Sequence, residues 1–272
     1  MHSLKNVTVL VTGAGRGIGK RIAIGFSARG ARVGLLARSK AELDLCHLEI
    51  EHAGGHSLRV RADVTDYEQM AAAADRMRVH FNSGVQVLVC AAAIQGPIGR
   101  FAETPAKAWA ETIQTNLIGV MHCCRAVLPD MISHRSGKII VLAGGGAATP
   151  RPNFSAYAAS KAAVARFVES VSEEIINDNV QINCMSPSGT YTNMTDEIIS
   201  AGDRAGGSEV EDARQIQLTG GTSPEKQIEL ALFLASEKSN HITGRLISVK
   251  DDWKKLKEHT PKPALYTLRR VQ

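Results

Sequence analysis

The architecture follows from one segment, Val7-Thr8-Val9-Leu10-Val11-Thr12-Gly13-Ala14-Gly15-Arg16-Gly17-Ile18-Gly19. Its apolar first half predicts a buried strand, and its glycines predict a tight turn that opens a helix. Glycines let a backbone turn sharply and approach a pyrophosphate, whose charge is favoured at a helix N-terminus. The order of strand, turn and helix therefore favours a dinucleotide-binding turn over a plain tight turn.

The rest of the chain alternates between short apolar runs and longer stretches of helical period. We expect strands at residues 7–11, 31–37, 56–60, 85–90, 138–143, 180–185 and 246–249, and helices at residues 17–29, 40–52, 67–81, 105–133, 154–177 and 224–235. Strands that are apolar throughout are buried on both faces, which indicates a parallel sheet covered by helices. The expected fold is therefore a doubly wound α/β fold with seven parallel strands in three layers, α/β/α.

One domain is expected over residues 1–252, because no internal repeat or linker interrupts this pattern. Residues 190–222 break the rhythm, since they are polar and rich in glycine, and we interpret them as a mobile flap. Residues 253–272 are expected to form a C-terminal tail with several basic side chains, either a solvated helix end or an oligomer contact.

The composition of the 272 residues excludes several classes of protein. Hydrophobic residues make up 44% and charged residues 22%, which is ordinary for a globular protein and excludes intrinsic disorder. No apolar run approaches the ~20 residues that a membrane helix needs, so no membrane partner is expected. The formal net charge of +5 suits an anionic ligand but does not by itself indicate nucleic acid. The five cysteines lack metal-ligand spacing, and we interpret them as reduced thiols of a cytoplasmic protein without a metal site.

The end of the second expected strand indicates which dinucleotide binds. An NAD site places an acidic residue there for the ribose 2′-hydroxyl, whereas an NADP site places an arginine nearby for the 2′-phosphate. Here the acidic position is Ala37, the basic Arg38 follows, and Arg16 lies inside the glycine turn. We therefore expect NADP(H) to be preferred over NAD(H); two ordinary solvated arginines are the alternative. Asp63 and Val64 follow the third strand and are expected beside the adenine, with a helix-capping Asp63 as the alternative.

Tyr157 and Lys161 are four residues apart in an expected helix, so their side chains lie on one face. A tyrosine with a pKa near ~10 is a poor acid–base group at neutral pH, and a nearby ammonium lowers that pKa. The same lysine can reach a ribose hydroxyl. Asn116 lies inside the helix expected at residues 105–133, where asparagine is unfavourable. It either serves the site or is a buried amide satisfied by backbone groups.

Taken together, these motifs resemble the short-chain dehydrogenase/reductase family. The resemblance rests on the ordered set Thr12-Gly13, Gly17-Ile18-Gly19, Asp63-Val64, Asn116, Tyr157-Ala158-Ala159-Ser160-Lys161 and Pro187-Ser188-Gly189-Thr190-Tyr191-Thr192. It covers residues 7–249, nearly the whole chain. It implies a Rossmann-like fold, hydride transfer between a nicotinamide and a carbonyl or alcohol, and a homodimer or homotetramer.

The resemblance also implies roles for individual residues. Tyr157 would be the acid–base group, Lys161 would hold the ribose and tune Tyr157, and Asn116 would anchor a proton-relay water. Thr192 would contact the carboxamide of the nicotinamide. The residues expected to contact the cofactor are Thr12, Gly13, Gly15, Arg16, Gly17, Ile18, Gly19, Arg38, Asp63, Val64, Ala91, Lys161, Pro187 and Thr192.

The sequence departs from the family's pattern in three places. The catalytic serine that the family places thirteen residues before the tyrosine is Gly144, and the preceding position, often also serine, is Ala143. The usual Asn-Asn-Ala-Gly after the fourth strand is Cys90-Ala91-Ala92-Ala93, and the usual Pro-Gly is Pro187-Ser188. The serine hydroxyl polarises the substrate carbonyl, and losing one such donor costs about 10²–10³ in rate.

Three kinds of group are considered as replacements for that hydroxyl. They are backbone N–H groups of the Gly144-Gly145-Gly146 loop, a nearby hydroxyl such as that of Ser155 or Thr149, and a polar group of the substrate itself. We favour the loop, because glycine permits close approach of the backbone. Gly144 is therefore included among the expected catalytic residues.

Further segments, among them Gly144-Gly145-Gly146-Ala147 and Asp251-Asp252-Trp253, resemble reductase-like members of the family associated with sugar and polysaccharide genes. This resemblance implies a polar, sugar-like keto substrate. Arg100 and Arg151 are expected to flank the cleft, where they would suit an anionic group. Solvated surface arginines are the alternative.

Two functions follow from these observations. The first is an NADP(H)-dependent dehydrogenase/reductase acting on the carbonyl or secondary alcohol of a small polar molecule, weakened by loss of the serine. The alternative is a catalytically silent protein that binds the dinucleotide and serves as a scaffold or sensor. Tyr157, Lys161 and Asn116 favour the enzyme, whereas Gly144 and Ala143 favour the silent protein.

Overall fold

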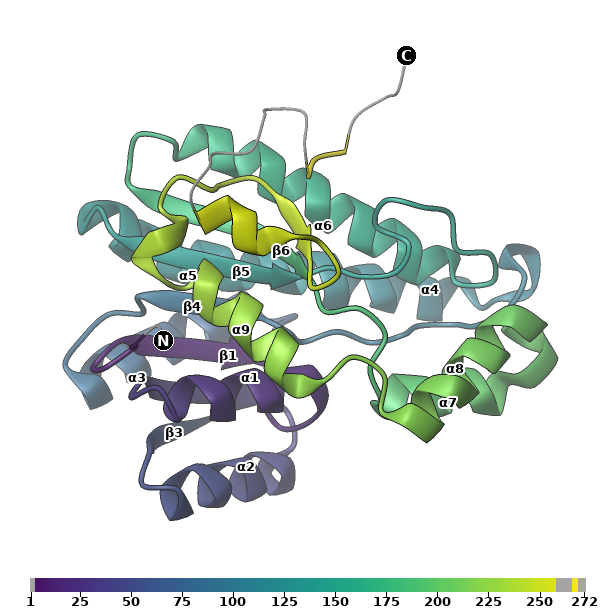
Figure 1. Cartoon of the computed structure of the whole chain (residues 1–272), viewed down its shortest axis with the longest axis horizontal. Coiled ribbons are helices and arrows are strands. Elements are labelled where there is room, and N and C mark those ends of the chain that lie inside the picture. The colour runs from purple at the N-terminus through teal and green to yellow at the C-terminus, as the bar shows by residue number, and fades with distance from the viewer. Residues whose placement is uncertain (1–2, 258–265, 269–272) are drawn as a thin grey trace.

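The computed structural model describes residues 3–257 and 266–268 of the chain (Figure 1). Within these residues, seven parallel strands form one sheet in the order β3-β2-β1-β4-β5-β6-β7. They are β1 (Thr8–Thr12), β2 (Arg32–Ala37), β3 (His56–Arg61), β4 (Val87–Cys90), β5 (Gly137–Leu142), β6 (Val180–Ser186) and β7 (Leu246–Ser248). The expected doubly wound parallel sheet is confirmed.

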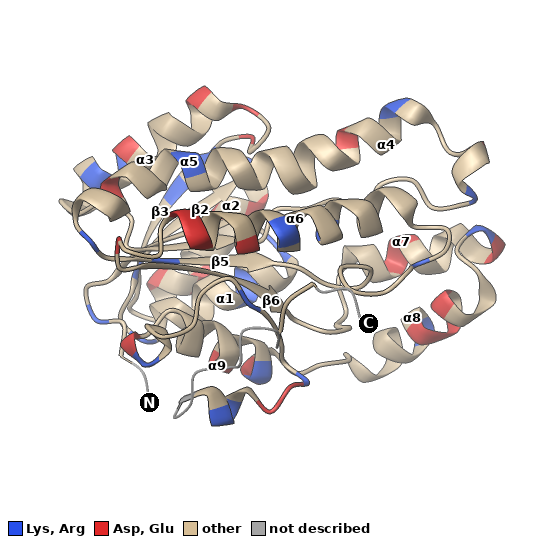
Figure 2. Ribbon diagram, turned by 90° about the horizontal axis from the view of Figure 1, so that it is seen from above, with Lys and Arg blue, Asp and Glu red and all other residues tan. Residues whose placement is uncertain are grey.

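Helices cover both faces of the sheet, which gives the three expected layers (Figures 1 and 2). They are α1 (Gly17–Ser27), α2 (Lys40–His52), α3 (Tyr67–Phe81), α4 (Ala106–Ile113), α5 (Gly119–Ser133), α6 (Ser155–Glu174), α7 (Asn193–Ala201), α8 (Gly207–Thr219) and α9 (Pro224–Leu234). One apolar cluster packs α1, α2 and α9 on one face through side chains such as Phe26, Ile50 and Phe233. A second packs α3, α5 and α6 on the other face through side chains such as Met77 and Val164.

The single helix expected at residues 105–133 is interrupted. A π-helical turn, η2 (Gln114–Ile118), separates α4 from α5 and carries Asn116. Such turns are rare and often occur at functional sites. A π-turn lets the helix continue in nearly the same direction, so the apolar period of the sequence does not reveal it. The remaining short turns are η1 (Phe101–Glu103), η3 (Gly202–Arg204), η4 (Glu237–Ser239) and η5 (Trp253–Lys257).

The segment interpreted as a flap contains two helices, α7 and α8, that the sequence did not predict. An antiparallel bridge between Thr190 and Gly221 closes its base, and we call residues 190–221 the α7–α8 lobe. Arg21 of α1 ties this base down: its Nη1 donates to Thr190 Oγ1 at 2.6 Å and its Nη2 to the Tyr191 carbonyl at 3.1 Å. Figure 1 shows the lobe at one end of the molecule, far from α3.

The packed core continues past the boundary expected at residue 252. Trp253 and Leu256 lie in η5 and are buried in the same cluster as α1 and α9. The Trp253 ring stacks on Phe233 with ring centroids 5.3 Å apart. The expected tail therefore begins as part of the core, whereas its basic pair Arg269-Arg270 lies outside the described residues.

The described part of the chain was searched for membrane-spanning helices and metal-binding groups, and its charged residues can be followed along the ribbon. In it, no helix is both long and apolar enough to cross a membrane. No group of three or more His, Cys, Asp and Glu side chains in these residues is arranged to hold a metal ion. Figure 2 shows Lys and Arg interspersed with Asp and Glu over most elements, so the positive net charge is spread rather than gathered.

Candidate active site

A cavity of about 500 Å³ opens at the carboxyl ends of the strands, where β1 and β4 lie side by side. In an open α/β sheet, this is the crevice in which ligands bind. Most residues predicted to contact the cofactor line it: Gly13, Gly15, Arg16, Gly17, Ile18, Gly19, Arg38, Asp63, Val64, Ala91, Lys161, Pro187 and Thr192. Tyr157 lines the same cavity, so one space holds the glycine turn and the predicted acid–base group.

The turn between β1 and α1 leaves no room for a side chain at Gly13 or, where α1 begins, at Gly19. Gly13 has a φ of +66°, and a Cβ added there would lie 2.8 Å from the Ala92 nitrogen. A Cβ added at Gly19 would collide with the Gly13 carbonyl oxygen. Within the described residues, no side-chain hydrogen bond caps α1 at Arg16, so the N–H groups of its first turn are available to an anion. This cradle fits a pyrophosphate at a helix N-terminus.

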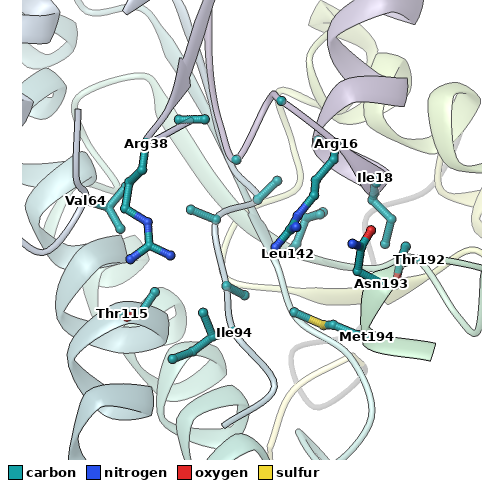
Figure 3. A pocket seen from close by; sticks show the side chains of 18 of the residues that line it. Arg16, Ile18, Arg38, Val64, Ile94, Thr115, Leu142, Thr192, Asn193 and Met194 are labelled. Atoms are coloured by element: carbon teal, nitrogen blue, oxygen red, sulfur yellow. The ribbon is translucent and has the colours of Figure 1, made fainter. Parts of the chain in front are cut away.

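Two arginines reach the cavity from different elements (Figure 3). Arg38 follows β2 and pairs with Asp63 at 3.7 Å, and Arg16 precedes α1 and pairs with Glu42 at 3.5 Å. Both arginine side chains are more than half exposed, so each ion pair is weak and each guanidinium is available to a phosphate. Ala37, at the position where an NAD site carries an acid, also lines the cavity.

The structure distinguishes the two interpretations of Asp63. The cap of α3 is Asp66, whose side chain accepts a hydrogen bond from Gln69 N, so Asp63 is not the helix cap. Asp63 Oδ1 instead accepts hydrogen bonds from the N–H and the hydroxyl of Thr65, at 3.0 and 2.9 Å. These bonds fix Asp63 at the cavity wall, together with Val64.

Tyr157 and Lys161 lie one turn apart on α6, and both line the cavity. Lys161 Nζ lies 5.5 Å from the centre of the Tyr157 ring and donates to the Leu142 carbonyl at 2.8 Å. The lysine side chain is buried. Desolvation of the ammonium lowers the pKa of Lys161 to about 8, although Cys184 and Cys90 act in the opposite direction.

Burial has the opposite effect on the phenol, because its charged form is the deprotonated one. It raises the pKa of Tyr157, and the charge that opposes this rise is Arg151. The expectation that Lys161 lowers the pKa of Tyr157 is therefore not met in this structure. The ammonium is held on the Leu142 carbonyl, and the cost of desolvating the phenolate dominates.

Asn116 is fully buried, and its side chain is already engaged. Its Oδ1 accepts from Ile94 N at 2.8 Å, while its Nδ2 donates to the Ile94 carbonyl at 2.9 Å and to Ser160 Oγ at 3.1 Å. The side chain thus braces the segment after β4 against α6 and lies outside the cavity lining. The side chain is therefore occupied, and only the backbone of Asn116 is left to hold the expected relay water.

Gly144 lies beside the phenol. A Cβ added there would lie 3.7 Å from the Tyr157 hydroxyl oxygen, although Gly144 itself is outside the cavity lining. The N–H groups of Gly144, Gly145 and Gly146 have no hydrogen-bond acceptor in the part of the chain that the structure describes. Within the described residues, three successive amide donors are therefore free in the loop next to Tyr157.

Thr12 also lies outside the cavity lining, contrary to the expectation of a cofactor contact. It is buried beneath the turn, where its Oγ1 accepts hydrogen bonds from the N–H groups of Ala91 and Ala92, both at 3.2 Å. Its short polar side chain thus joins the ends of β1 and β4. Its role is to hold the cavity floor together.

Several lining residues were not singled out from the sequence: Leu36, Ser39, Glu42, Ala62, Ile94, Thr115, Leu142, Asn193, Met194 and Glu197. The last three come from α7, and the signal for that helix is the Thr192–Thr195 capping box. Ser39 and Glu42 show a similar signal, because Ser39 Oγ accepts from Glu42 N at the start of α2. The other residues are neutral wall positions with no sequence signal.

The two arginines expected to flank the cleft are both paired. Arg151 makes two hydrogen bonds to Glu209 of α8, at 2.9 and 2.7 Å. Arg100 is strongly exposed and lies 3.6 Å from Glu103. Neither lines the cavity, so the expectation that they receive an anionic substrate group is not supported by their positions.

A family model described as short chain dehydrogenase matches residues 7–202. The chain belongs to the short-chain dehydrogenase family. The oxidoreductase UcpA of Salmonella typhimurium is 32% identical over 247 residues, which cover 90% of this chain and 93% of that protein. A putative NAD(P)-dependent gluconate 5-dehydrogenase from Beutenbergia cavernae, with bound NADP, is 30% identical, with a TM-score of 0.81 and coverage of 93% and 99%. A 3-oxoacyl-[acyl-carrier protein] reductase from Brucella melitensis, with bound NAD, is 27% identical, with a TM-score of 0.75 and coverage of 91% and 90%.

Membership of the short-chain dehydrogenase family makes this chain one of a family of oxidoreductases that bind a nicotinamide dinucleotide. The relatives include complexes with NADP and with NAD, so membership gives the class of cofactor and leaves the choice between the two to the residues of this chain.

Replacing Lys161 with methionine is expected to change how stability depends on pH. The pKa of Lys161 is about 8 in the folded protein and 10.5 for a free side chain, so between these values the unfolded chain binds a proton that the folded chain does not. Stability contributed by this lysine therefore rises with pH. Relative to Lys161→Met, the free energy of unfolding of the wild type should rise by about 2 kcal/mol between about pH 7 and pH 9.5.

Urea unfolding of both proteins at the two pH values measures this difference. Lys250→Met removes an exposed lysine and is the control, for which no such change is expected. Parallel pH dependences of the wild type and Lys161→Met would contradict a buried lysine with a lowered pKa.

Proposed function

We propose that this protein is an NADP(H)-dependent dehydrogenase/reductase that interconverts a carbonyl group and a secondary alcohol on a small, polar, sugar-like molecule. The observation that carries the proposal is the shared cavity. Its walls include the glycine turn, Arg38, and the Tyr157–Lys161 pair. A phosphate cradle and an acid–base pair in one space are the parts that this reaction needs from the protein.

The residues of the cavity suggest how the dinucleotide would be held. The first turn of α1, after Gly13, would receive the pyrophosphate, and Asp63 and Val64 would flank the adenine. Lys161 would bind ribose hydroxyls, and Thr192 would contact the carboxamide. When bound, the cofactor supplies the hydride for the carbonyl carbon, or accepts it from the alcohol in the reverse direction.

Tyr157 would move the proton. In reduction it would donate its phenolic proton to the carbonyl oxygen, and in oxidation it would take that proton back. The phenol is protonated at neutral pH, which is the form that reduction needs, and burial raises its pKa further. The proton would then be replaced through Lys161 and a water at the backbone of Asn116. A lysine with a pKa near neutrality is suited to this transfer.

The preference for NADP(H) is supported by charge at the adenosine end of the cavity. Arg38 and Arg16 are exposed there, and the position of the usual acid is Ala37. A 2′-phosphate could replace the weak partners Asp63 and Glu42 without leaving a buried charge.

The variant Arg38→Ala tests this preference. It is expected to weaken NADPH binding about tenfold and to leave NADH binding nearly unchanged, because hydrogen bonds to a charged group are worth ~1.5–3 kcal/mol. Fluorescence titration of both cofactors gives the dissociation constants, with Arg100→Ala as an exposed arginine outside the cavity for comparison. Wild-type protein that binds NADH as tightly as NADPH, or more tightly, would refute the assignment.

The free amides of the Gly144-Gly145-Gly146 loop are proposed to replace the missing serine hydroxyl. They adjoin the Tyr157 hydroxyl, and backbone N–H groups serve as donors to a developing oxyanion in other acyl and carbonyl reactions. Since Gly144 has a φ of +154°, a side chain there is strained whatever space it finds.

Gly144→Ser and Gly144→Ala separate these effects, because both add the same backbone strain and only serine adds a hydroxyl. If the amides already act as donors, the turnover of Gly144→Ser should exceed that of Gly144→Ala by no more than a few-fold. Steady-state turnover with NADPH measures the difference. A gain of about 10²-fold or more for serine over wild type would show that the natural loop lacks a working donor.

Polar side chains of the α7–α8 lobe support the proposal that the substrate is polar. Asn193 and Glu197 of α7 line the same cavity as Tyr157 and suit hydroxyl groups of a sugar-like molecule. The relative from Beutenbergia cavernae, a putative gluconate 5-dehydrogenase, is named for such a substrate.

The second candidate function is a catalytically silent protein that binds the dinucleotide as a scaffold or sensor. Ala143 and Gly144 favour it, because neither position carries a hydroxyl. The burial that raises the pKa of Tyr157 also favours it, since the phenol would be a reluctant acid.

The variant Tyr157→Phe distinguishes the two functions. Turnover of NADPH against a panel of ketoses, keto-sugars and quinones should fall by about 10²-fold or more, because an acid–base group is removed. Cofactor affinity should hardly change, because the phenyl ring keeps its place on α6. Tight NADPH binding with no turnover in the wild type would instead support the silent protein.

We also propose that the protein works in the cytoplasm as a homodimer or homotetramer, as the family resemblance and the five free, buried thiols suggest.

A further inference from the structure

A charged contact joins the α7–α8 lobe to the residues just before α6. Arg151 Nε donates to Glu209 Oε1 at 2.9 Å, and its Nη2 donates to Oε2 at 2.7 Å. The side chains of Arg151 and Glu209 are 16% and 29% exposed, so the pair is partly shielded from water. Paired hydrogen bonds of this geometry fix the orientation of both side chains.

The same guanidinium lies over two aromatic rings. It is 3.9 Å from the centre of the Phe154 ring and 5.6 Å from the centre of the Tyr157 ring. On another side it borders the glycine loop, since a Cβ added at Gly145 would lie 3.9 Å from Arg151 Cδ. Arg151 therefore contacts the lobe directly and lies beside both the phenol ring and the glycine loop.

The lobe is seated on this region by further contacts. Asn153 Nδ2 donates to the Ala205 carbonyl at 3.2 Å, and Phe154 is fully buried among apolar side chains that include Ile198 and Val210. At its base the lobe is tied to α1 through Arg21. The lobe thus bridges the phosphate helix and the start of the helix that carries Tyr157.

We propose that Arg151 is a positioning residue, clamped by Glu209, that couples the seating of the α7–α8 lobe to the orientation and ionisation of Tyr157. The proposal rests on the proposed function, in which Tyr157 moves the proton. With the lobe seated, the guanidinium is held over the phenol ring. With the lobe displaced, Arg151 loses the carboxylate that neutralises it but stays stacked on Phe154 beside the phenol, so the phenol faces a stronger positive charge.

The direction of the effect follows from the charges around the phenol. Those charged groups are Arg151, Lys161 on α6, Glu197 on α7, Glu209 on α8, Arg16 before α1, and the exposed Lys107 and Glu111 on α4, which packs against α6. Arg151 lowers the pKa of Tyr157 and so opposes burial. Glu209 neutralises part of that field. Removing the arginine should therefore raise the pKa of Tyr157, and removing the charge of Glu209 should lower it.

The experiment measures the ionisation of Tyr157 directly. Ultraviolet difference absorption reports phenolate formation, and each protein is compared with its own Tyr157→Phe counterpart so that the other tyrosines cancel. The variants are Arg151→Met, Glu209→Gln and the double variant, with Arg100→Met as the control for loss of an exposed arginine paired to a carboxylate. Hydrogen exchange of residues 193–219 in the same proteins reports the seating of the lobe.

We expect the pKa of Tyr157 to shift upward in Arg151→Met and downward in Glu209→Gln. Once Arg151 is absent, Glu209→Gln should have no effect on this pKa. Faster exchange in the lobe is expected for both single variants and not for the control. Turnover with NADPH should fall on the order of tenfold in Arg151→Met. Shifts of the same sign in the two single variants, or no shift in either, would overturn the proposal, because a merely structural pair would not reverse the sign.

Arg151→Lys guards against a variant that fails to fold. It keeps the charge and loses the paired hydrogen bonds, so it should keep the pKa near the wild-type value and still loosen the lobe. If the pKa of Tyr157 shifts as far in Arg151→Lys as in Arg151→Met, the role of the positive charge is contradicted. A protein without turnover would contradict the proposed function. The role of Arg151 is tested separately, because the titration of Tyr157 needs no substrate.

Discussion

The approach of the β1–α1 turn to the end of β4 sets the position of every other part of the site. Thr12 receives hydrogen bonds from the N–H groups of Ala91 and Ala92, and Gly13 comes so close to Ala92 that a Cβ would not fit. The two central strands therefore end at the same level, and α1 starts over the crevice between them. That contact aims the unpaired N–H groups of α1 at the cavity and explains why small residues are required on both sides.

Desolvation is the second force that shapes the site. It pushes the pKa of Lys161 down and that of Tyr157 up, so the two groups approach the neutral forms that a buried pair prefers. The hydrogen bond from Lys161 to the Leu142 carbonyl compensates the lysine, whereas the phenol is compensated mainly by Arg151. The cation that opposes the rise in the pKa of Tyr157 thus comes from outside α6, and the lobe that holds this cation also supplies part of the cavity wall.

The sequence predicted the sheet well, because its strands are apolar throughout and alternate with helical stretches, a pattern with few alternatives. It also predicted most of the residues around the glycine turn that line the cavity, since glycines that approach a phosphate have a recognisable spacing. It did not predict α7 and α8, because glycine-rich polar sequence hides helices whose apolar positions face only a small satellite cluster. Nor could it place Thr12, Asn116 or Arg151, because each owes its role to partners distant in sequence. Local spacing carries no information about such partners.

The most direct measurement is a crystal structure of the protein grown with NADP⁺. We expect pyrophosphate density on the N–H groups at the start of α1, with the nicotinamide ring facing the Tyr157 hydroxyl and a ribose hydroxyl within hydrogen-bond distance of Lys161. A dinucleotide bound away from this crevice, or a nicotinamide ring turned from Tyr157, would contradict this arrangement.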